Sequence, residues 1–522
     1  MTTGKFIFKA TVMIAFFKLM SQALGVVREA VIARQFGTTV STDAYIVALR
    51  MPNIVFYIVS GALVTAIVPV FTEYVARGRK DEAWKVFNTV VIVITLLFSV
   101  ITLAGIAGSP LLVTLMAPFF EGQAEALTAE LAGIILPLMI FAGLASLFTN
   151  LLNANNIFGL PAFSLSVNNI FIILSALTIG SIYGIHGLAL GTVLAAAAMA
   201  LIQLPALYRT GFRLKFSIEL SHPGVRKVFC LAWPAAVGVA VRQANIYVSG
   251  VLASWLPEGS ISALNFAERL MNFPVGLFVL ALGTAAFPTL AKRAAEGNRE
   301  AYSDVLAGSL KAVLAGIIPA GIGFMVLSRP IVTLVYKRGV FDEQSVSMTA
   351  AALFFYAVGL AGLAASVLLE RGFYSFQDTR TPVKVGIVAV LINLVLSLLL
   401  IRPLQLGGIA LATSLSSLTY AGLLMFYLER KRPVFRGSGL FRFTAAVLAA
   451  SGLMAAASWG VCMATEGLTG GTAGVIAQVG LSVAAGIAVY TAALFAMGVE
   501  EARAVWRAAV EAVKGGTTRR KA

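Results

Sequence analysis

The sequence predicts an all-α protein that crosses a membrane many times, and three observations predict this. Hydrophobic residues make up 59% of the 522 residues and charged residues only 12%, whereas soluble domains average about 25% charged residues. Apolar stretches of about 20 residues, enough for a helix to cross roughly 30 Å of hydrocarbon, recur along the chain. Two long parts of the chain also repeat one another. The composition excludes a soluble globular protein, a disordered chain and a nucleic-acid-binding domain.

Fourteen stretches are long and apolar enough to be transmembrane helices. They cover residues 8–35, 42–75, 85–108, 128–153, 160–183, 187–208, 226–254, 260–291, 303–328, 344–372, 381–401, 406–429, 441–464 and 473–498. Lys18 interrupts the first stretch, Arg28 and Glu29 lie further along it, and no small-residue cleavage site ends it. We therefore expect a retained first helix rather than a cleaved signal peptide.

The net charge of +16 is explained by membrane topology. If the N-terminus is cytoplasmic, five of the 39 Lys and Arg residues lie in outer segments: Arg34, Arg329, Lys337, Arg338 and Arg402. Six lie inside predicted spans: Lys18, Arg28, Arg50, Arg242, Arg269 and Lys311. The other 28 lie in cytoplasmic segments, as the positive-inside rule requires. This bias predicts that both termini are cytoplasmic, and it leaves no case for a nucleic-acid partner.

The chain contains an internal duplication at an offset of about 220 residues. Over residues 44–78, 11 of 35 aligned positions are identical 219 residues later. The recurring residues are Ala44, Ala48, Arg50, Asn53, Ala62, Leu63, Thr65, Ala66, Pro69, Ala76 and Gly78. A second match, at an offset of 221, pairs GLALGTVL at 187–194 with GIALATSL at 408–415.

The duplication predicts two six-helix lobes of the same orientation, which is the parallel type of internal repeat. We expect an N-terminal lobe at 1–215, a C-terminal lobe at 216–432, and helices 13 and 14 with a basic cytoplasmic tail at 433–522. Substrate sites in such proteins lie where the repeats meet, near the middle of the membrane.

Cations inside the spans are the candidate site residues, because each costs roughly 2.5–3.5 kcal/mol at a helix centre. Arg50 and Arg269 occupy equivalent positions and would flank the axis relating the two halves, where an anion could bridge them. Alternatively, each forms a structural ion pair, with Asp43 or Glu268 as the acid. Arg28 beside Glu29 allows the same two interpretations. Lys18, Arg242 and Lys311 have no equivalent in the other half, so they are weaker candidates for substrate binding.

Signatures of enzymatic chemistry are missing from the sequence. There is no Walker-type phosphate loop, the two histidines are isolated, and Cys230 and Cys462 lie in separate apolar stretches. No catalytic residue, metal site or cofactor is predicted. The remaining classes of protein are a transporter, a channel and a scaffold. A channel is not favoured, because the sequence shows no repeated filter loop.

Several segments resemble the MurJ/MviN family of lipid II flippases, which lies within the multidrug/oligosaccharidyl-lipid/polysaccharide exporter superfamily. They are SQALGVVREAVIARQFG (21–37), TDAYIVALRMPN (42–53), GALVTAIVPVF (61–71), ISALNFAERLMNFPVGLFVLALGTAAFPTLA (261–291), YKRGVFDEQS (336–345), GFYSFQDTRTPVKVGIVAVLINLVL (372–396) and GGIALATSL (407–415). The AERLMNFP and QDTRTPVK segments are the most specific. The resemblance covers helices 1 to 12.

The resemblance implies fourteen helices, alternating access, and transfer of undecaprenyl-pyrophosphate-linked peptidoglycan precursor from the inner to the outer leaflet. It implies that the partners are this lipid-linked anionic glycan and membrane lipids, in the bacterial cytoplasmic membrane. We expect a monomer, and association with cell-wall synthesis enzymes stays open. Arg28 matches the helix-1 arginine of the family, Arg269 the helix-8 arginine and Asp43 the acid that begins helix 2. Asp378 and Arg380 of QDTRTPVK join Glu29, Asp43 and Glu268 as candidates for gating or ion pairing.

Two departures from the family pattern bear on the substrate. Gln22 stands where many members have an arginine, and Asn53 is followed by IVFYIVSG, where many have an Arg-Arg pair and then Glu-Gly. Arg50 lies within one turn of the missing helix-2 cations and could partly replace them. The alternatives to lipid II are therefore another polyprenyl-linked oligosaccharide and a non-transporting envelope scaffold. A drug exporter is disfavoured by the repeated cation.

Overall fold

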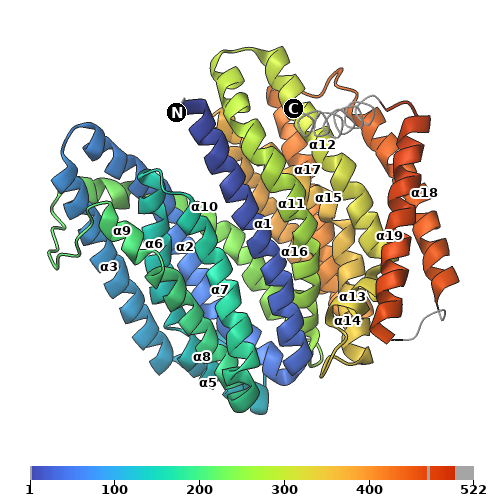
Figure 1. Ribbon diagram of the computed structural model, residues 1–522, viewed down its shortest axis with the longest axis horizontal. Helices are drawn as coiled ribbons and strands as arrows, with labels where there is room; N and C mark the ends of the chain where they lie inside the picture. The colour runs from blue at the N-terminus through green and yellow to red at the C-terminus, as the bar shows by residue number, and fades with distance from the viewer. Residues whose placement is uncertain (1–2, 467–470, 500–522) are drawn as a thin grey trace, which may run out of the picture. The chain divides into compact units, whose positions relative to one another are not determined.

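The structure is a computed structural model of the chain, and it describes residues 3–466 and 471–499. Within these residues the chain forms α-helices joined by short connections, without a β-strand (Figure 1). The predicted all-α class is therefore confirmed.

The helices of the first half of the chain are α1 (Thr3–Phe36), α2 (Val40–Ala76), α3 (Lys80–Ala107), α4 (Ser109–Met116), α5 (Gln123–Ile135), α6 (Leu138–Ala154), α7 (Gly159–Leu177), α8 (Ile179–Leu201) and α9 (Leu204–Arg209). Those that follow are α10 (Pro223–Ala253), α11 (Ser260–Ala295), α12 (Arg299–Val326), α13 (Ser328–Tyr336), α14 (Glu343–Val358), α15 (Leu360–Ser375), α16 (Arg380–Leu404), α17 (Leu406–Lys431), α18 (Leu440–Thr465) and α19 (Gly471–Ala496).

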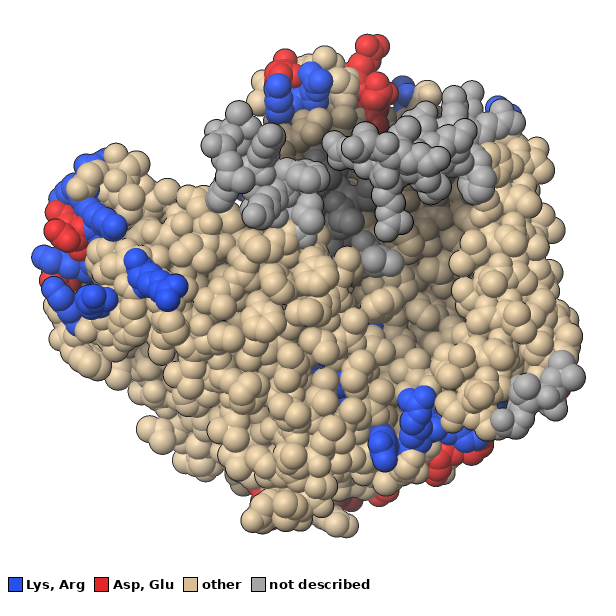
Figure 2. All heavy atoms as spheres, viewed as in Figure 1, with Lys and Arg blue, Asp and Glu red and all other residues tan. Residues whose placement is uncertain are grey.

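Membrane-spanning character is confirmed by the helices that the structure describes. Among the described residues, 11 helices are long and apolar enough to cross a membrane, or 12 if α14 and α15, which are bent by 46°, form one span. Helices α1 and α11 cover two further predicted spans but fall outside this count, and some of their side chains lie outside the described part of the chain. The count of fourteen therefore stays a prediction. Figure 2 shows Lys, Arg, Asp and Glu gathered at helix ends, with an almost wholly uncharged surface between them.

The duplication predicted from 11 identities extends through the secondary structure. Helix α3 and helix α12 both have 28 residues, and their bounds differ by 219 at each end. Three pairs of residues with positive φ recur at offsets of 219 or 221: Gly78 and Gly297 (75° and 70°), Asn156 and Gln377 (60° and 59°), and Gly184 and Gln405 (59° and 49°). Because positive φ is uncommon outside glycine, its recurrence at Asn156, Gln377 and Gln405 indicates that both halves inherited one backbone path.

The chain divides into two compact units. The first runs to Arg269 and includes Tyr336–Ser345, and the second contains Leu270–Val335 and the chain from Val346 onward. Helix α10, predicted to begin the C-terminal lobe, belongs to the first unit, where it packs along α2. The lobe boundaries expected at 215 and 432 stay a prediction.

Each unit is a helical bundle with its own packing. In the first, α2 packs against α3, α5, α6 and α10, and α7 lies between α1 and α8. In the second, α12 packs against α15 and α18, α17 packs against α15 and α16, and α18 lies beside α19 (Figure 1). Small residues allow close approach, as is common between membrane helices. A Cβ atom built on Gly362 of α15 would lie 2.6 Å from the backbone nitrogen of Leu418 in α17.

Replacing Gly362 by alanine should therefore push α15 away from α17. Overpacking of this kind costs about 1–3 kcal/mol, and thermal unfolding of the purified chain in detergent should occur at a lower temperature. Gly422→Ala in α17 is the matched control, because a Cβ built there meets no atom within 4 Å. Equal unfolding temperatures for Gly362→Ala and the parent chain would contradict this packing.

Candidate functional site

Asp43, in the first turn of α2, binds the N-terminus of α11. Its Oδ2 accepts a hydrogen bond from the backbone N–H of Gly259 and its Oδ1 one from Ser262, both at 2.7 Å, and the residue is only 4% exposed. A carboxylate is favourable there because the first N–H groups of a helix have no partner within it and carry partial positive charge.

The contact between Asp43 and Ser262 joins equivalent positions of the duplication. The two residues are 219 positions apart, which is the offset of the first repeat match. Arg50 and Arg269 each lie seven residues, or about 10 Å, further along α2 and α11. The two equivalent arginines therefore follow this contact at the same spacing.

Each of these arginines lies against a glycine in the first helix of the other half. The Nη2 atom of Arg269 would be 1.5 Å from a Cβ built on Gly25 of α1, and Nη1 of Arg50 would be 2.6 Å from one built on Gly250 of α10. In both cases the guanidinium occupies the space that a larger residue would fill. The two arginine–glycine contacts are therefore of the same kind.

Arg28 is held by a network between α1 and α7. Its Nη2 and Nε donate to Oε1 of Glu29 at 2.5 and 3.2 Å, and its Nη1 donates to Oδ1 of Asn169 at 3.1 Å. Asn169 in turn donates to the backbone oxygen and the hydroxyl of Ser21, each at 3.1 Å. Glu29 and Asn169 are buried, and the Arg28 side chain is 23% exposed. Arg28 is thus fixed in position while part of it stays accessible.

Arg269 joins this network as a second cation. Gly25, which it contacts, lies three residues before Arg28 on the same face of α1, and the charges of Arg28 and Glu29 act on Arg269. The Arg269 Nε atom is buried and finds no hydrogen-bond acceptor among the described residues. The carboxylates of Glu29 and Glu268 both act on Arg269, and an anion placed beside its Nε would supply the missing acceptor.

The end of α1 near Phe36 is tied to the segment Tyr336–Ser345. The backbone N–H of Val340 donates to the Arg34 oxygen at 2.9 Å, and the hydroxyls of Thr38 and Ser345 lie 2.7 Å apart. Gly339 has φ +62°, and a Cβ on it would lie 2.3 Å from the Arg34 oxygen. Only glycine allows this close approach of the two backbones. The contact between the end of α1 and Tyr336–Ser345 therefore depends on Gly339.

The remaining predicted site residues differ in how close they lie to the arginine cluster. Glu268 is exposed, and its charge acts on the neighbouring Arg269. Asp378 and Arg380 belong to the second unit, at the start of α16, where Arg380 is exposed and Asp378 binds Thr381 and Lys431. Of the other cations in spans, Lys18 is half-buried and Lys311 lies over the Phe443 ring at 5.6 Å. The Arg242 side chain lies outside the described part of the chain.

Sequence reasoning missed the residues that position the arginines. Asn169 is an uncharged polar residue inside an apolar span, and such residues in membrane helices usually bind a neighbouring helix, which was a usable signal. Gly25 precedes Arg28 in the LGVVR segment, but nothing in the sequence indicated that a distant arginine would lie on it. Tyr336, whose hydroxyl donates to the Phe266 oxygen at 3.1 Å, was equally hidden.

The fold and the cluster define a polytopic helical membrane protein with an internal repeat and with arginines at equivalent positions of that repeat. A family model described as "Lipid II flippase MurJ" matches residues 32–476. The chain belongs to this family.

Individual relatives agree with this assignment. The chain is 31% identical over 525 residues to a probable lipid II flippase MurJ of Vibrio cholerae, which covers 95% of this chain and 97% of that protein. It is 30% identical over 462 residues to the lipid II flippase MurJ of Burkholderia cenocepacia, covering 86% and 89%.

Solved structures agree on the fold. A structure titled "Lipid II flippase MurJ, inward closed conformation" matches with a TM-score of 0.80 at 22% identity, covering 93% of this chain and 99% of the other. An inward-facing multidrug resistance transporter of the MATE family and MOP superfamily matches with a TM-score of 0.68 at 14% identity, covering 81% and 99%. These matches show that the chain shares the fold of both transporters.

Glu29→Gln should destabilise the chain, whereas Arg269→Met should not. Removing one partner of a buried ion pair costs about 3–5 kcal/mol, and the lower end is expected because Arg28 keeps its bond to Asn169. Arg269 leaves a buried nitrogen without an acceptor, so an apolar side chain of similar length loses little. Thermal unfolding in detergent measures both. A stable Glu29→Gln variant together with an unstable Arg269→Met variant would contradict this description of the cluster.

The start of α16 should lose stability at low pH. Burial alone raises the pKa of Asp378, but bonds from Lys431 and Thr381 more than offset it and lower that pKa to about 2. The unfolded value is about 3.9, so Asp378 stabilises the fold above pH 4, and this contribution disappears as pH falls toward 2. Hydrogen exchange at the first turn of α16 should therefore differ between Asp378→Asn and the parent at pH 7, and the difference should shrink below pH 4. A difference independent of pH would be contrary to this assignment.

Proposed function

We propose that this chain is a flippase that moves lipid II from the inner to the outer leaflet of the bacterial cytoplasmic membrane. The observation that carries the proposal is the family match over residues 32–476, whose members are named for this activity. The cationic cluster is consistent with a lipid-linked pyrophosphate as cargo. The chain is accordingly a transporter rather than an enzyme, and peptidoglycan synthesis is the process that it serves.

The pyrophosphate is the group that the cluster would bind. Arg28, Arg50 and Arg269 are the proposed contacts, because a guanidinium fork binds two phosphate oxygens at once. Arg269 supplies the strongest argument, since its buried Nε has no acceptor among the described residues. Arg28 can contact an anion through its accessible part while Glu29 and Asn169 keep its orientation.

Glu29 and Asp43 have supporting roles in this scheme. Glu29 balances one of two neighbouring guanidinium groups, so the empty cluster keeps a net positive charge. Asp43 ties α2 to α11 and therefore fixes the spacing of Arg50 and Arg269. Glu268, Asp378 and Arg380 are proposed as gating or ion-pair residues only.

Alternating access requires the site to open to each side of the membrane in turn. The ties from Arg34, Thr38 and Gly259 to neighbouring segments are proposed to close the outer side. Without cargo, the like charges of the cluster repel one another, and binding of an anion removes this repulsion. The cargo would thus shift the population by its different affinity for the two states. Each charge moved across the membrane also couples this equilibrium to the potential, by about 2.3 kcal/mol per 100 mV.

The topology belongs to the proposal. We propose fourteen spans in two six-helix lobes with helices 13 and 14 outside the repeat, both termini in the cytoplasm, and a monomer that could associate with cell-wall synthesis enzymes. The distribution of Lys and Arg supports the orientation.

A second cargo is favoured by one observation. The residues after Asn53 in α2 are uncharged, where the family pattern implied cations and an acid. A relative moving another polyprenyl-linked oligosaccharide would share the pyrophosphate and differ in the sugars, so the arginine cluster would be kept. A non-transporting scaffold would have no need of the cluster.

Complementation of cells depleted of their own lipid II flippase should distinguish these possibilities. The parent chain should restore growth and outer-leaflet lipid II, and Arg28→Ala or Arg269→Ala should not. Loss of a charged hydrogen bond of about 1.5–3 kcal/mol weakens binding roughly ten- to hundredfold. Arg269→Lys should restore part of the transport if charge suffices, and little if the fork is required.

The matched control is Arg293→Ala, which removes a cation from the same helix. Arg293 is paired with Glu296 at 2.9 Å near the end of α11, so its loss should leave transport unchanged. Failure of the parent chain to rescue despite normal membrane insertion would favour the other oligosaccharide. Full activity of Arg269→Ala would refute the site.

A further inference from the structure

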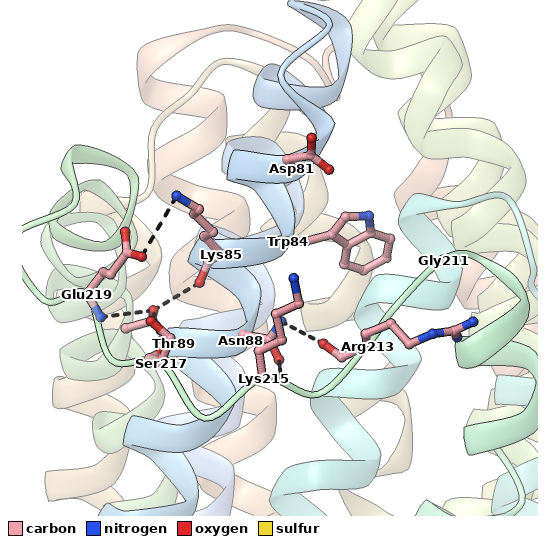
Figure 3. Close-up of a pocket in the computed structure, with 10 residues that line it drawn as sticks. All are labelled: Asp81, Trp84, Lys85, Asn88, Thr89, Gly211, Arg213, Lys215, Ser217 and Glu219. Atoms are coloured by element: carbon pink, nitrogen blue, oxygen red, sulfur yellow. Dashed lines mark hydrogen bonds and ion pairs between the residues drawn. The ribbon is translucent and has the colours of Figure 1, made fainter.

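A pocket in the first unit is lined by none of the residues discussed above. It has a volume of about 250 Å³ and lies between the start of α3 and the segment after α9 (Figure 3). Helix α3 contributes Trp84, Lys85 and Asn88, and the segment contributes Lys215 and Glu219 among others. We call residues Phe212–Leu220 the strap.

Side chains alternate along the strap. Arg213, Lys215, Ser217 and Glu219 line the pocket. The residues between them are apolar and exposed: Leu214 (44%), Phe216 (88%), Ile218 (51%) and Leu220 (56%). Period-two alternation is what an extended segment shows when its two faces meet different surroundings. One face of the strap is polar and turned toward α3, and the other is apolar and uncovered.

Two side chains of α3, those of Asn88 and Thr89, form hydrogen bonds with the backbone of the strap, as a neighbouring β-strand would. The Asn88 side chain donates to the Arg213 oxygen at 3.0 Å and accepts from the Lys215 N–H at 3.3 Å. Thr89 accepts from the Glu219 N–H at 3.3 Å, and the Ser217 N–H donates to the Lys215 oxygen at 2.9 Å. Satisfied N–H groups are a condition for placing non-helical backbone close to hydrocarbon.

The strap lies beside the first turns of a candidate span. Trp84 is near the start of α3, that span, and tryptophan is enriched where membrane helices leave the hydrocarbon. Asn88 and Thr89, which hold the strap, are one turn further into the same span. We therefore expect the strap at the depth of the membrane interface and Phe216, which is 88% exposed, to face lipid.

The pocket face favours an anion. Lys85 and Glu219 pair loosely at 3.9 Å, and Arg213 donates to the oxygens of Tyr208 and Phe212. The ammonium group of Lys215 makes no recorded bond to any described residue, and Figure 3 shows its side chain extending into the pocket toward Trp84. The lining holds three cations and two acids. Trp84 is itself fixed by ring contacts with Phe71, Phe87 and Phe212.

We propose that the strap is a membrane-interface element that binds an anionic phospholipid. The lipid phosphate lies between Lys85 and Lys215, and the acyl chains lie along Leu214 and Phe216 in the same leaflet. The cations thus lie at the depth of the lipid phosphate, and the apolar side chains lie at the depth of its acyl chains. This lipid site is separate from the proposed cargo site. Only its assignment to the cytoplasmic leaflet rests on the proposed orientation of the chain.

The first test measures lipid binding to the purified full chain. Phosphatidylglycerol is titrated into detergent micelles, and bound lipid is counted by native mass spectrometry. The double variant Lys85→Ala/Lys215→Ala should bind phosphatidylglycerol about fivefold more weakly for each cation removed, since a cation near an anionic surface contributes about 1 kcal/mol. The control double variant Lys80→Ala/Arg226→Ala removes two exposed cations outside the pocket and should bind like the parent.

Three results would overturn the proposal. These are equal affinity in the pocket variant and the parent, equal weakening in the two double variants, and displacement of the lipid by inorganic phosphate at similar concentration. The third would identify a free-anion site. The assay does not involve translocation, so its outcome is independent of the flippase activity.

A second measurement places the strap without removing a charge. Spin labels are attached to Phe216→Cys and Ser217→Cys in a Cys230→Ala/Cys462→Ala background and reconstituted in bilayers containing phosphatidylglycerol. The label at 216 should be relaxed strongly by oxygen and weakly by a water-soluble nickel complex, and the label at 217 should show the reverse ratio. Equal access of the nickel complex to both labels would exclude insertion of the strap.

Discussion

Holding positive charge inside an apolar bundle is the constraint on which the rest of the first unit depends. An uncompensated cation at the centre of a membrane helix costs roughly 2.5–3.5 kcal/mol, so each arginine needs a partner or a shaped space. Arg28 has Glu29 beside it and Asn169 across from it. Arg269 and Arg50 lie against glycines of a neighbouring helix, where the absence of a side chain leaves space for the guanidinium. The packing of α1, α7, α10 and α11 is therefore arranged around these side chains.

The duplication explains why an arginine occurs at this position twice. Once one ancestral half had an arginine in its second helix, duplication gave each half a copy. The Asp43 carboxylate meets the N-terminus of α11 at the residue equivalent to itself. A carboxylate at a helix N-terminus satisfies orphan N–H groups and gains from the helix dipole. The contact therefore couples the start of the second helix in one half to the same helix in the other.

The sequence predicted the repeat and the helical class, since each depends on local pattern or on identities at a fixed offset. It could not give partners that arise from folding. An ion pair of Asp43 with an arginine was one of two interpretations, and the Asp43 carboxylate also binds backbone N–H groups of a segment 216 to 219 residues away, which no pattern indicated. The pairing of Arg28 with Asn169 spans 141 residues. The strap was invisible as well, because its alternation covers only nine residues and became meaningful only when Asn88 and Thr89 fixed it beside a span.

The symmetry of the arginines is not matched by their surroundings, and this asymmetry bears on the cargo. The residues 219 positions after Arg28 and Glu29 are Tyr247 and Val248, and Tyr247 donates its hydroxyl to the Leu115 oxygen at 2.7 Å. At these two positions α10 therefore has neither the cation nor the acid that α1 has at Arg28 and Glu29. A symmetric anion would gain from two equal half-sites, whereas the proposed cargo, a lipid-linked pyrophosphate, has a lipid at one end and a sugar at the other. Different residues around the two equivalent arginines suit the proposed recognition of such a two-ended ligand, because the charged group would bind in a single direction.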